Sequence, residues 1–221
     1  MQGEILRAEL VCQKIIPNVD AGLAKHLKLR DDQRSLALFT ASVDDITFIA
    51  CDEATKKADI EVVYCESTFS ALDDPYAKLS GEAIALLAAP NPAEARAGLE
   101  AAIDHVYNGA YYVNADEAGE SIYMAHTISS SGSYLPTLCD VLEVAPGTPM
   151  AYCMAPPVEM FYAVDAALKA AEVQIAGFFN PPLNTTNIAG AIMIGTQSAC
   201  KAACDAFAAA CIYVANHPTE L

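Results

Sequence analysis

A helix followed by a strand occurs twice in this chain, and the duplication restricts the possible fold more than any other feature. The stretch VDAALKAAEVQIAGFF, at positions 164–179, predicts a small-residue helix that runs directly into a strand. CDEATKKADIEVVYCES, at positions 51–67, has the same character. Five identities recur at a shift of 113 positions: Phe48 and Phe161, Asp52 and Asp165, Ala54 and Ala167, Lys56 and Lys169, Ala58 and Ala171. Neither copy contains side chains that suggest catalysis.

A second repeated unit follows each copy of the first. Positions 81–109 predict an apolar strand and then a helix, with Asn91 as the N-cap and Pro92 in the first turn. The helix is expected to end at Asn108, before Gly109. Positions 189–216 repeat the pattern at a shift of 105, through four pairs: Arg96 and Lys201, Ala97 and Ala202, Glu100 and Asp205, Ala101 and Ala206.

The N-terminal part of each half shows a looser correspondence. NVDAGLAKHLKL at 18–29 and GSYLPTLCDVLEV at 132–144 each predict a short amphipathic helix, and a strand follows at 34–41 and at 148–155. In this alignment Leu23 and Leu27 match Leu138 and Leu142. Each half therefore predicts an α+β domain with a mostly antiparallel sheet flanked by helices. The expected domains are residues 1–112 and 113–221.

Composition excludes several classes of function. The 221 residues carry a net charge of −16, whereas nucleic-acid binding requires clustered Lys and Arg. No apolar stretch is long and uncharged enough to predict a membrane span, and no signal peptide opens the chain. The eight cysteines include no CxxC pair, so we expect buried thiols in a reduced cytosol and no metal site. Three of them, at positions 200, 204 and 211, share one helix face.

Catalytic motifs are also missing. The chain has no GxSxG, HExxH, GxGxxG or Walker sequence, and of its four histidines only His126 is expected near a loop that could line a site. A single histidine at such a place is more often structural. We therefore expect no catalytic residues.

Three carboxylates form the clearest candidate for a site. Asp44 and Asp45 are expected in a turn between two strands, within SVDDIT, and Glu82 opens the strand GEAIALLAA. If these strands are neighbours, the acids converge beside Tyr111 and Tyr112. Acids next to aromatic rings suit a small cation through ion pairing and cation–π attraction. The alternative is ordinary turn chemistry for the two aspartates and an exposed strand start for Glu82.

The repeated stretches resemble the signature of bacterial microcompartment shell proteins. Two such domains in one chain, each preceded by its own helix and strand, resemble the circularly permuted tandem class. The strings RSLALFTASVDDITFIACDEATKKADIEVVY, PNPAEARAGL, GTPMAYCMAPPVE and GTQSACKAACDAF are similar to the trimeric shell proteins of ethanolamine utilisation. The resemblance covers nearly the whole chain and is weakest at residues 66–80 and 112–145.

This resemblance implies a cytoplasmic microcompartment as the location and a homotrimer that packs edge to edge with other shell proteins. It implies a gated central pore, with cobalamin as a candidate transported or bound ligand, and a small pore in each subunit that binds ethanolamine. The loops 67–80 and 180–187 are expected to line or cover the central pore. The ethanolamine contacts implied are Asp44, Asp45, Glu82, Tyr111, Tyr112, Thr186 and Asn187.

Two other hypotheses use the same three acids. A cytosolic enzyme that handles amines could bind its substrate with Asp44, Asp45 and Glu82. A pair of sensor domains could bind a small ligand there and regulate a partner. The shell protein agrees best with the sequence, because a tile requires duplicated domains with small-residue edges and requires no nucleophile.

Overall fold

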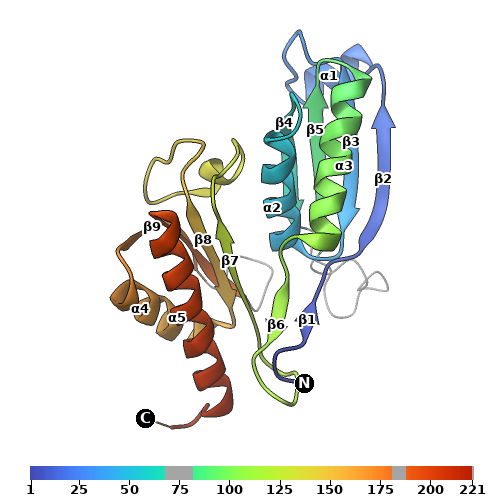
Figure 1. The fold of residues 1–221 in the computed structure, drawn as a ribbon. Helices are drawn as coiled ribbons and strands as arrows, with labels where there is room; N and C mark the ends of the chain where they lie inside the picture. Colours follow the sequence, from blue (N-terminus) through green and yellow to red (C-terminus); the bar gives the residue numbers. More distant parts are fainter. Residues whose placement is uncertain (68–81, 181–187, 221) are drawn as a thin grey trace. The chain divides into compact units, whose positions relative to one another are not determined.

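The computed structural model describes residues 1–67, 82–180 and 188–220, and these residues form two compact units (Figure 1). Unit 1 contains residues 1–7, 111–131 and 136–221, and unit 2 contains residues 8–110 and 132–135. Each unit has its own antiparallel sheet and its own pair of long helices. We describe the two units separately.

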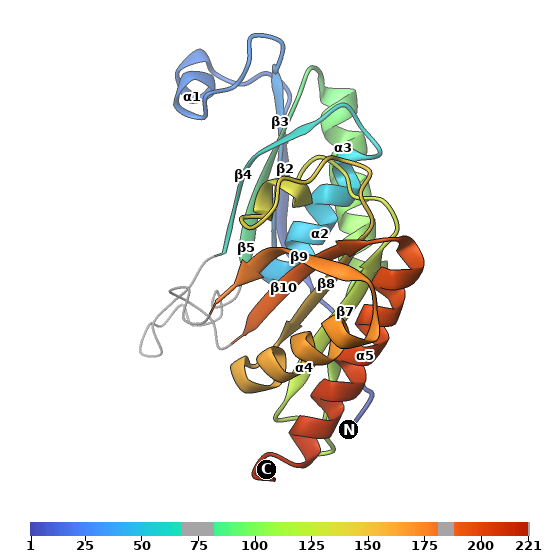
Figure 2. The ribbon, with the colours of Figure 1, turned by 90° about the vertical axis from the view of Figure 1, so that its left-hand side faces the viewer.

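Unit 2 is built on a four-stranded sheet with the order β2-β3-β5-β4. The strands are β2 (Leu10–Ile16), β3 (Ser35–Ala41), β5 (Ala83–Ala89) and β4 (Glu61–Ser67). The helices are α1 (Ala21–His26), α2 (Asp44–Thr55) and α3 (Pro92–Asn108). α2 and α3 pack side by side over one face of this sheet (Figures 1 and 2).

Unit 1 is built on a six-stranded sheet with the order β1-β6-β7-β8-β10-β9. The strands are β1 (Ile5–Leu6), β6 (Tyr112–Asn114), β7 (Ile122–Ile128), β8 (Met150–Ala155), β10 (Ala189–Gly195) and β9 (Val173–Phe179). The helices are α4 (Pro157–Ala170) and α5 (Gln197–Asn216), which pack against each other. A 3₁₀ turn, η2 (Leu135–Leu138), lies in the connection between β7 and β8.

The two units have equivalent topologies, as the repeated sequence predicts. The order β2-β3-β5-β4 in unit 2 corresponds to β7-β8-β10-β9 in unit 1, and α2 and α3 correspond to α4 and α5. The connections between the first two strands of each unit also correspond. The N–H of Val19 donates to the carbonyl of Arg34 at 2.9 Å, and the N–H of Ser131 donates to the carbonyl of Thr148 at 3.0 Å.

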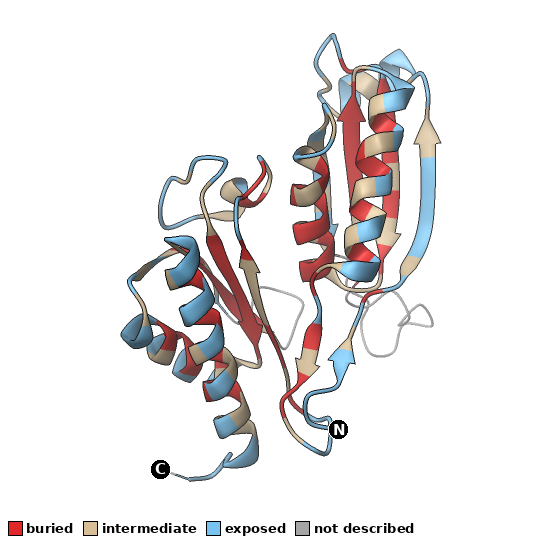
Figure 3. Ribbon diagram, in the orientation of Figure 1, coloured by how far each residue is buried: buried red, intermediate tan, exposed pale blue. Residues whose placement is uncertain are grey.

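Local sequence accounts for the helix ends and the core. The side chain of Asn91 accepts hydrogen bonds from the N–H groups of Ala93 and Glu94, so the predicted start of α3 is confirmed. Apolar residues on the inner helix faces and the strands form a buried core in each unit (Figure 3). In unit 1, α5 contributes small residues and one large ring to that core: Cys200, Ala203, Cys204, Phe207, Ala210 and Cys211.

The units are not the two contiguous halves that the sequence predicts. Residues 1–7 belong to the unit of the second half, and residues 132–135 belong to the unit of the first half. Residues 1–7 were expected with the first domain, but β1 pairs with β6 through Ile5 with Val113 and Leu6 with Tyr112, so they belong to unit 1. Residues 132–135 were expected with the second domain, but they pack on α2 of unit 2. Strand pairing fixes the first exchange, and backbone N–H groups that donate to the carboxylate of Asp52 fix the second. Sequence periodicity reveals neither.

Two local expectations were wrong. Asp44 and Asp45 do not lie in a turn between two strands but form the first turn of α2, where carboxylates interact favourably with the helix dipole. Residues 132–144 do not form an amphipathic helix, since only the short turn η2 is regular there. Pro136 lies within that turn, and a proline in a helix interior removes a backbone hydrogen-bond donor.

α5 is long and apolar enough to cross a membrane by length and composition alone, which the sequence analysis did not expect. In the structure one face of α5 packs on α4 and on the sheet of unit 1. The opposite face carries Lys201 and Asp205, whose side chains form an exposed ion pair at 2.6 Å. α5 therefore has the two faces of a helix that packs on a sheet.

All eight cysteines lie among the described residues, and none of them forms a disulfide. Five are buried, as expected of thiols that pack like alanine: Cys51, Cys153, Cys200, Cys204 and Cys211. Cys12 is exposed, and Cys65 and Cys139 are half-buried.

Candidate functional site

The carboxylates of unit 2 lie at one end of its sheet, where two strands end and a third begins. The last residues of β3 and β4 both pair with Ala83, the first residue of β5. Asp44 and Asp45 open the helix that follows β3, and Glu82 immediately precedes β5. β3 and β5 are thus neighbours, which is the condition that the sequence analysis set for the acids to converge. We call Asp44, Asp45 and Glu82 the acid end of unit 2.

Asp44 has hydrogen-bond donors on both carboxylate oxygens. The hydroxyl of Ser67 donates to Oδ2 at 2.8 Å, and the backbone N–H of Asp45 donates to Oδ1 at 2.9 Å. Burial raises the pKa of Asp44 above its ordinary value, and these two hydrogen bonds oppose the rise. The sequence analysis missed Ser67, because its contact with Asp44 depends on the pairing of β4 with β5.

Asp45 and Glu82 are more buried than Asp44. Each exposes 5% of its surface, so both carboxyl groups lie in a largely protein-lined environment. Burial raises the pKa of Glu82, since the charged form is poorly solvated there. A small cation at that end would favour the ionised forms of these carboxyl groups.

The other predicted site residues do not belong to this unit. Tyr112 is buried in β6 of unit 1, with 5% of its surface exposed. Tyr111 precedes it and is 37% exposed, and the guanidinium of Arg7 lies 5.3 Å from the centre of its ring. A cation–π contact within unit 1 therefore already uses one face of Tyr111. Thr186 and Asn187, together with most of the two loops assigned to the pore, lie outside the described residues.

Unit 1 lacks these acids at the equivalent positions. Pro157 is the first residue of α4, as Asp44 is of α2, so Val158 takes the place of Asp45. Ala189 opens β10 and pairs with the last residue of β8, as Ala83 pairs with the last residue of β3. Ile188 therefore corresponds to Glu82. The acid end is a feature of unit 2 alone.

A second carboxylate of α2, Asp52, is almost fully buried, with a side-chain exposure of 1%. Its Oδ2 accepts a hydrogen bond from the N–H of Gly132 at 2.6 Å, and its Oδ1 accepts from Tyr134 at 3.1 Å and from Leu135 at 2.9 Å. Burial raises the pKa of Asp52, while these hydrogen bonds and the charge of Lys56 oppose the rise. Asp52 thus anchors the segment 132–135 to unit 2 and has a structural role.

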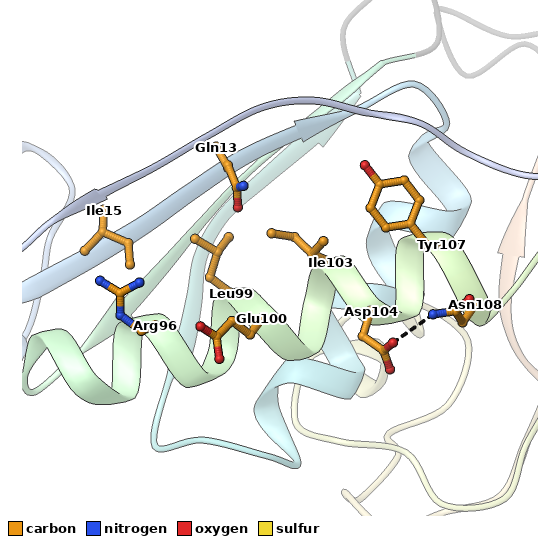
Figure 4. Close-up of a pocket in the computed structure, with 9 residues that line it drawn as sticks. All are labelled: Gln13, Ile15, Arg96, Leu99, Glu100, Ile103, Asp104, Tyr107 and Asn108. Carbon is orange, nitrogen blue, oxygen red and sulfur yellow. Dashed lines mark hydrogen bonds between the residues drawn. The ribbon is translucent and has the colours of Figure 1, made fainter.

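A groove of about 460 Å³ runs between β2 and α3 of unit 2 (Figure 4). Apolar side chains of Ile15, Leu99 and Ile103 line it, together with polar groups such as Arg96 and Glu100. None of the predicted site residues lines this groove. The acids and the groove are separate features of unit 2.

Within residues 1–67, 82–180 and 188–220, no group of three or more His, Cys, Asp or Glu side chains is arranged to hold a metal ion. His126, the only histidine considered for a site, lies in β7, where it pairs with Tyr152 of β8. Among the described residues, the acid end is therefore the candidate site that we consider, as a site for an organic cation and not for a metal ion.

No family model matches the chain. Individual proteins are nevertheless similar to it over nearly its whole length. The chain is 46% identical over 218 residues to the bacterial microcompartment shell protein EutL of Clostridium perfringens, covering 99% of both chains. It is 43% identical to EutL of Escherichia coli over 98% of this chain and 97% of that one. The crystal structure of the ethanolamine utilization protein EutL from Leptotrichia buccalis matches with a TM-score of 0.92 and 43% identity, covering 100% of each chain.

The duplicated α+β fold and these matches define a shell protein of bacterial microcompartments. The chain belongs to the EutL family, the shell proteins of the ethanolamine-utilisation microcompartment. Its location is accordingly the shell of that compartment. The resemblance seen in the sequence is confirmed over nearly the full length of the chain.

Proposed function

We propose that the protein is a non-catalytic tile of the microcompartment shell and that its working form is a homotrimer. The observation that supports this is the equivalence of the two units, with the same strand order and the same pair of long helices. Three chains supply six equivalent units, and a closed ring of six can repeat edge to edge in a flat layer with other shell proteins. A catalytic site would be an addition that this role does not require.

Light scattering of the purified chain tests the trimer. At micromolar concentration we expect one species of three times the chain mass of 23.3 kDa. A stable monomer would contradict the tile and would favour the amine-handling enzyme or the ligand sensor. Turnover of ethanolamine by the purified trimer would contradict the non-catalytic assignment alone.

The acid end of unit 2 supplies the ammonium contacts of an ethanolamine site in this proposal. A protonated amine is a compact donor, and hydrogen bonds between charged groups contribute roughly 1.5–3 kcal/mol each before desolvation. Asp44 and Asp45 supply two carboxylates from one helix start, and Glu82 supplies a third from the adjacent strand. Tyr111, Tyr112, Thr186 and Asn187 stay predicted contacts, as the family resemblance implies.

Calorimetry on matched variants tests this assignment. Asp45→Asn keeps the shape of the side chain and removes its charge, so we expect ethanolamine affinity to fall by about tenfold or more. Asp205→Asn removes an exposed acid from α5 of unit 1 and should leave the affinity unchanged. Equal affinity for Asp45→Asn and the wild type would overturn the site and leave the tile unaffected.

A gated central pore and the passage of cobalamin belong to the same proposal. They are supported by the family resemblance, and the loops 67–80 and 180–187 are the segments to which we assign the gate. Cysteine pairs placed in these two loops would hold the gate closed after cross-linking. We expect cross-linked trimers in a lipid-free planar array to pass cobalamin more slowly than reduced ones, and equal passage would place the gate elsewhere.

A further inference from the structure

One face of α2 is covered by a segment from the connection between β7 and β8. Leu135 of this segment is fully buried in unit 2, and the ring of Tyr134 lies 6.5 Å from that of Phe48 on α2. Asp52 and Thr55 of α2 accept hydrogen bonds from the backbone of the same segment. α2 therefore has a polar anchor and an apolar contact that both depend on this cover.

The equivalent face of α4 is exposed. Phe161, Asp165 and Leu168 take the places of Phe48, Asp52 and Thr55 at the shift of 113. Phe161 is 50% exposed and Leu168 is 37% exposed, and the side chain of Asp165 is 63% exposed. Tyr162 on the same helix is 52% exposed although its counterpart Ile49 is fully buried. The ring of Phe161 contacts that of Phe178 on β9, and the ring of Tyr162 stacks on that of Tyr213 on α5. Among the described residues, however, no segment lies over this part of α4 as 132–135 lies over α2.

The counterpart of the covering segment is the connection between β2 and β3. The equivalent hydrogen bonds of Val19 and Ser131 fix the register, so Leu23 corresponds to Leu135. This register replaces the match of Leu23 with Leu138 that the sequence favoured. Leu23 lies in α1 and is 39% exposed, and α1 has no buried residue at all. An amphipathic helix without a buried face is unusual unless a partner covers it.

From this correspondence we infer that α1 of one copy of the chain covers α4 of the next copy, with Leu23 packed against Phe161 and Leu168. The inference rests on the proposed trimer, in which the cover that unit 2 receives within a chain is supplied to unit 1 by the neighbouring chain. The partner is thus a second copy of this protein, and each copy contributes one element to each contact.

Charge also favours this pairing. α1 with its N-cap and the two residues after it carries Lys25, His26 and Lys28 against the single carboxylate of Asp20. α4 and the residues just after it carry three carboxylates, Glu159, Asp165 and Glu172, against the single Lys169. In a chain whose net charge is −16, a locally basic helix opposite a locally acidic one reduces the repulsion between copies.

The sizes of the facing residues indicate how the two contacts differ. A Cβ at Gly132 would lie 2.2 Å from Oγ1 of Thr55 and 2.4 Å from the carbonyl oxygen of Asp52, so the cover of α2 requires glycine there. Asp20 stands at the equivalent position before α1 and caps it by accepting from Gly22 at 2.8 Å. The covering helix must therefore lie further from α4, and Leu168 in place of Thr55 fills the added space.

Photo-crosslinking of the assembled protein tests the contact. A benzophenone amino acid at position 23 should cross-link to residues 157–170 of another copy, and mass spectrometry of mixed isotope-labelled and unlabelled chains identifies links between copies. The same group at Val11, exposed on β2, is the control and should not give this link. Links from position 23 to any other region, or only within one chain, would overturn the contact while leaving a wild-type trimer intact.

A pair of substitutions provides a second, independent measurement. Leu23→Asp should raise the trimer dissociation constant at least tenfold, while the circular dichroism of the chain stays unchanged because Leu23 is exposed. Leu142→Asp changes the same residue type at a similar exposure, 37%, and should alter the dissociation constant less than twofold. Equal effects of the two substitutions would contradict the contact, whereas a monomeric wild-type protein would instead contradict the proposed function.

Discussion

Units 1 and 2 share one scaffold but differ at the sheet end where the first long helix begins. Unit 2 carries Asp44, Asp45 and Glu82 at that end, and unit 1 carries proline, valine and isoleucine at the same places. The second difference concerns the helix itself. α2 is covered within the chain and holds its cover through a buried aspartate, whereas the aspartate at the same position of α4 is exposed. Duplication thus preserved the backbone, and the two copies then took different side-chain roles.

The largest expected effect is a difference in stability between variants of the two equivalent aspartates, Asp52 and Asp165. Asp52→Ala should lower the free energy of unfolding by about 3 kcal/mol or more, because three backbone N–H groups lose a charged acceptor in a buried place. Asp165→Ala removes only an exposed ion pair within its own chain and should change the free energy of unfolding of the dissociated chain by no more than about 0.5 kcal/mol. Urea denaturation measures both, and similar values for the two variants would show that the cover of α2 contributes little.

The close approach of segment 132–135 to α2 predicts the next largest effect. Gly132→Ala forces a Cβ against the backbone of Asp52, and overpacking of this kind costs about 1–3 kcal/mol. This destabilisation should appear as faster amide hydrogen exchange at Tyr134 and Leu135, whose N–H groups donate to Asp52. Gly147→Ala in unit 1 adds no close contact but places alanine at a positive φ of 88°, so it strains the backbone without crowding α2 and should leave exchange at Tyr134 and Leu135 unchanged. Unchanged exchange at Tyr134 would contradict the anchoring role of Asp52.

The acid end predicts a pH dependence of ethanolamine binding that unit 1 cannot provide. Burial raises the pKa of Asp44 and of Glu82, so these carboxyls ionise at higher pH than ordinary ones. A bound ammonium favours the ionised forms and lowers both pKa values, so affinity should rise as pH increases through this range. We expect a gain of about tenfold between pH 4 and pH 7, since an alkylammonium stays protonated throughout. Calorimetry at several pH values measures it, and a flat profile would contradict binding at the acid end.

The smallest expected effect concerns Ser67. Ser67→Ala removes the hydroxyl that donates to Asp44 at 2.8 Å, and this hydrogen bond opposes the rise of the pKa of Asp44. The pKa of Asp44 should therefore rise further in the variant. Carbon-detected NMR titration of the aspartate carboxyls in the wild type and in the variant measures this. A lower pKa of Asp44 in Ser67→Ala would show that another group dominates its environment.

Much of the fold could be predicted from the sequence, because helices and strands leave periodic patterns in a chain. The shifts of 113 and 105 indicated the duplication, and Asn91 and Pro92 marked the start of α3. The three acids were grouped by their expected places at the ends of neighbouring strands, and the family resemblance implied the same group. Asp44 and Asp45 were nevertheless placed in a turn, since a pair of aspartates is equally compatible with a turn and with the first turn of a helix.

The sequence by itself thus determined the duplicated α+β class and the family, and it predicted a cation site at the acids of unit 2. Only the tertiary structure decided which segment covers which helix. The strand pairing of residues 5–6 with β6 and the hydrogen bonds of Asp52 with residues 132–135 join positions about 80 to 110 residues apart. Contacts between residues so far apart leave no periodic pattern in the sequence. For the same reason the sequence could not predict the contact of Ser67 with Asp44 or the difference between Asp52 and Asp165. Identical residues in similar local sequence become buried or exposed only through what packs against them.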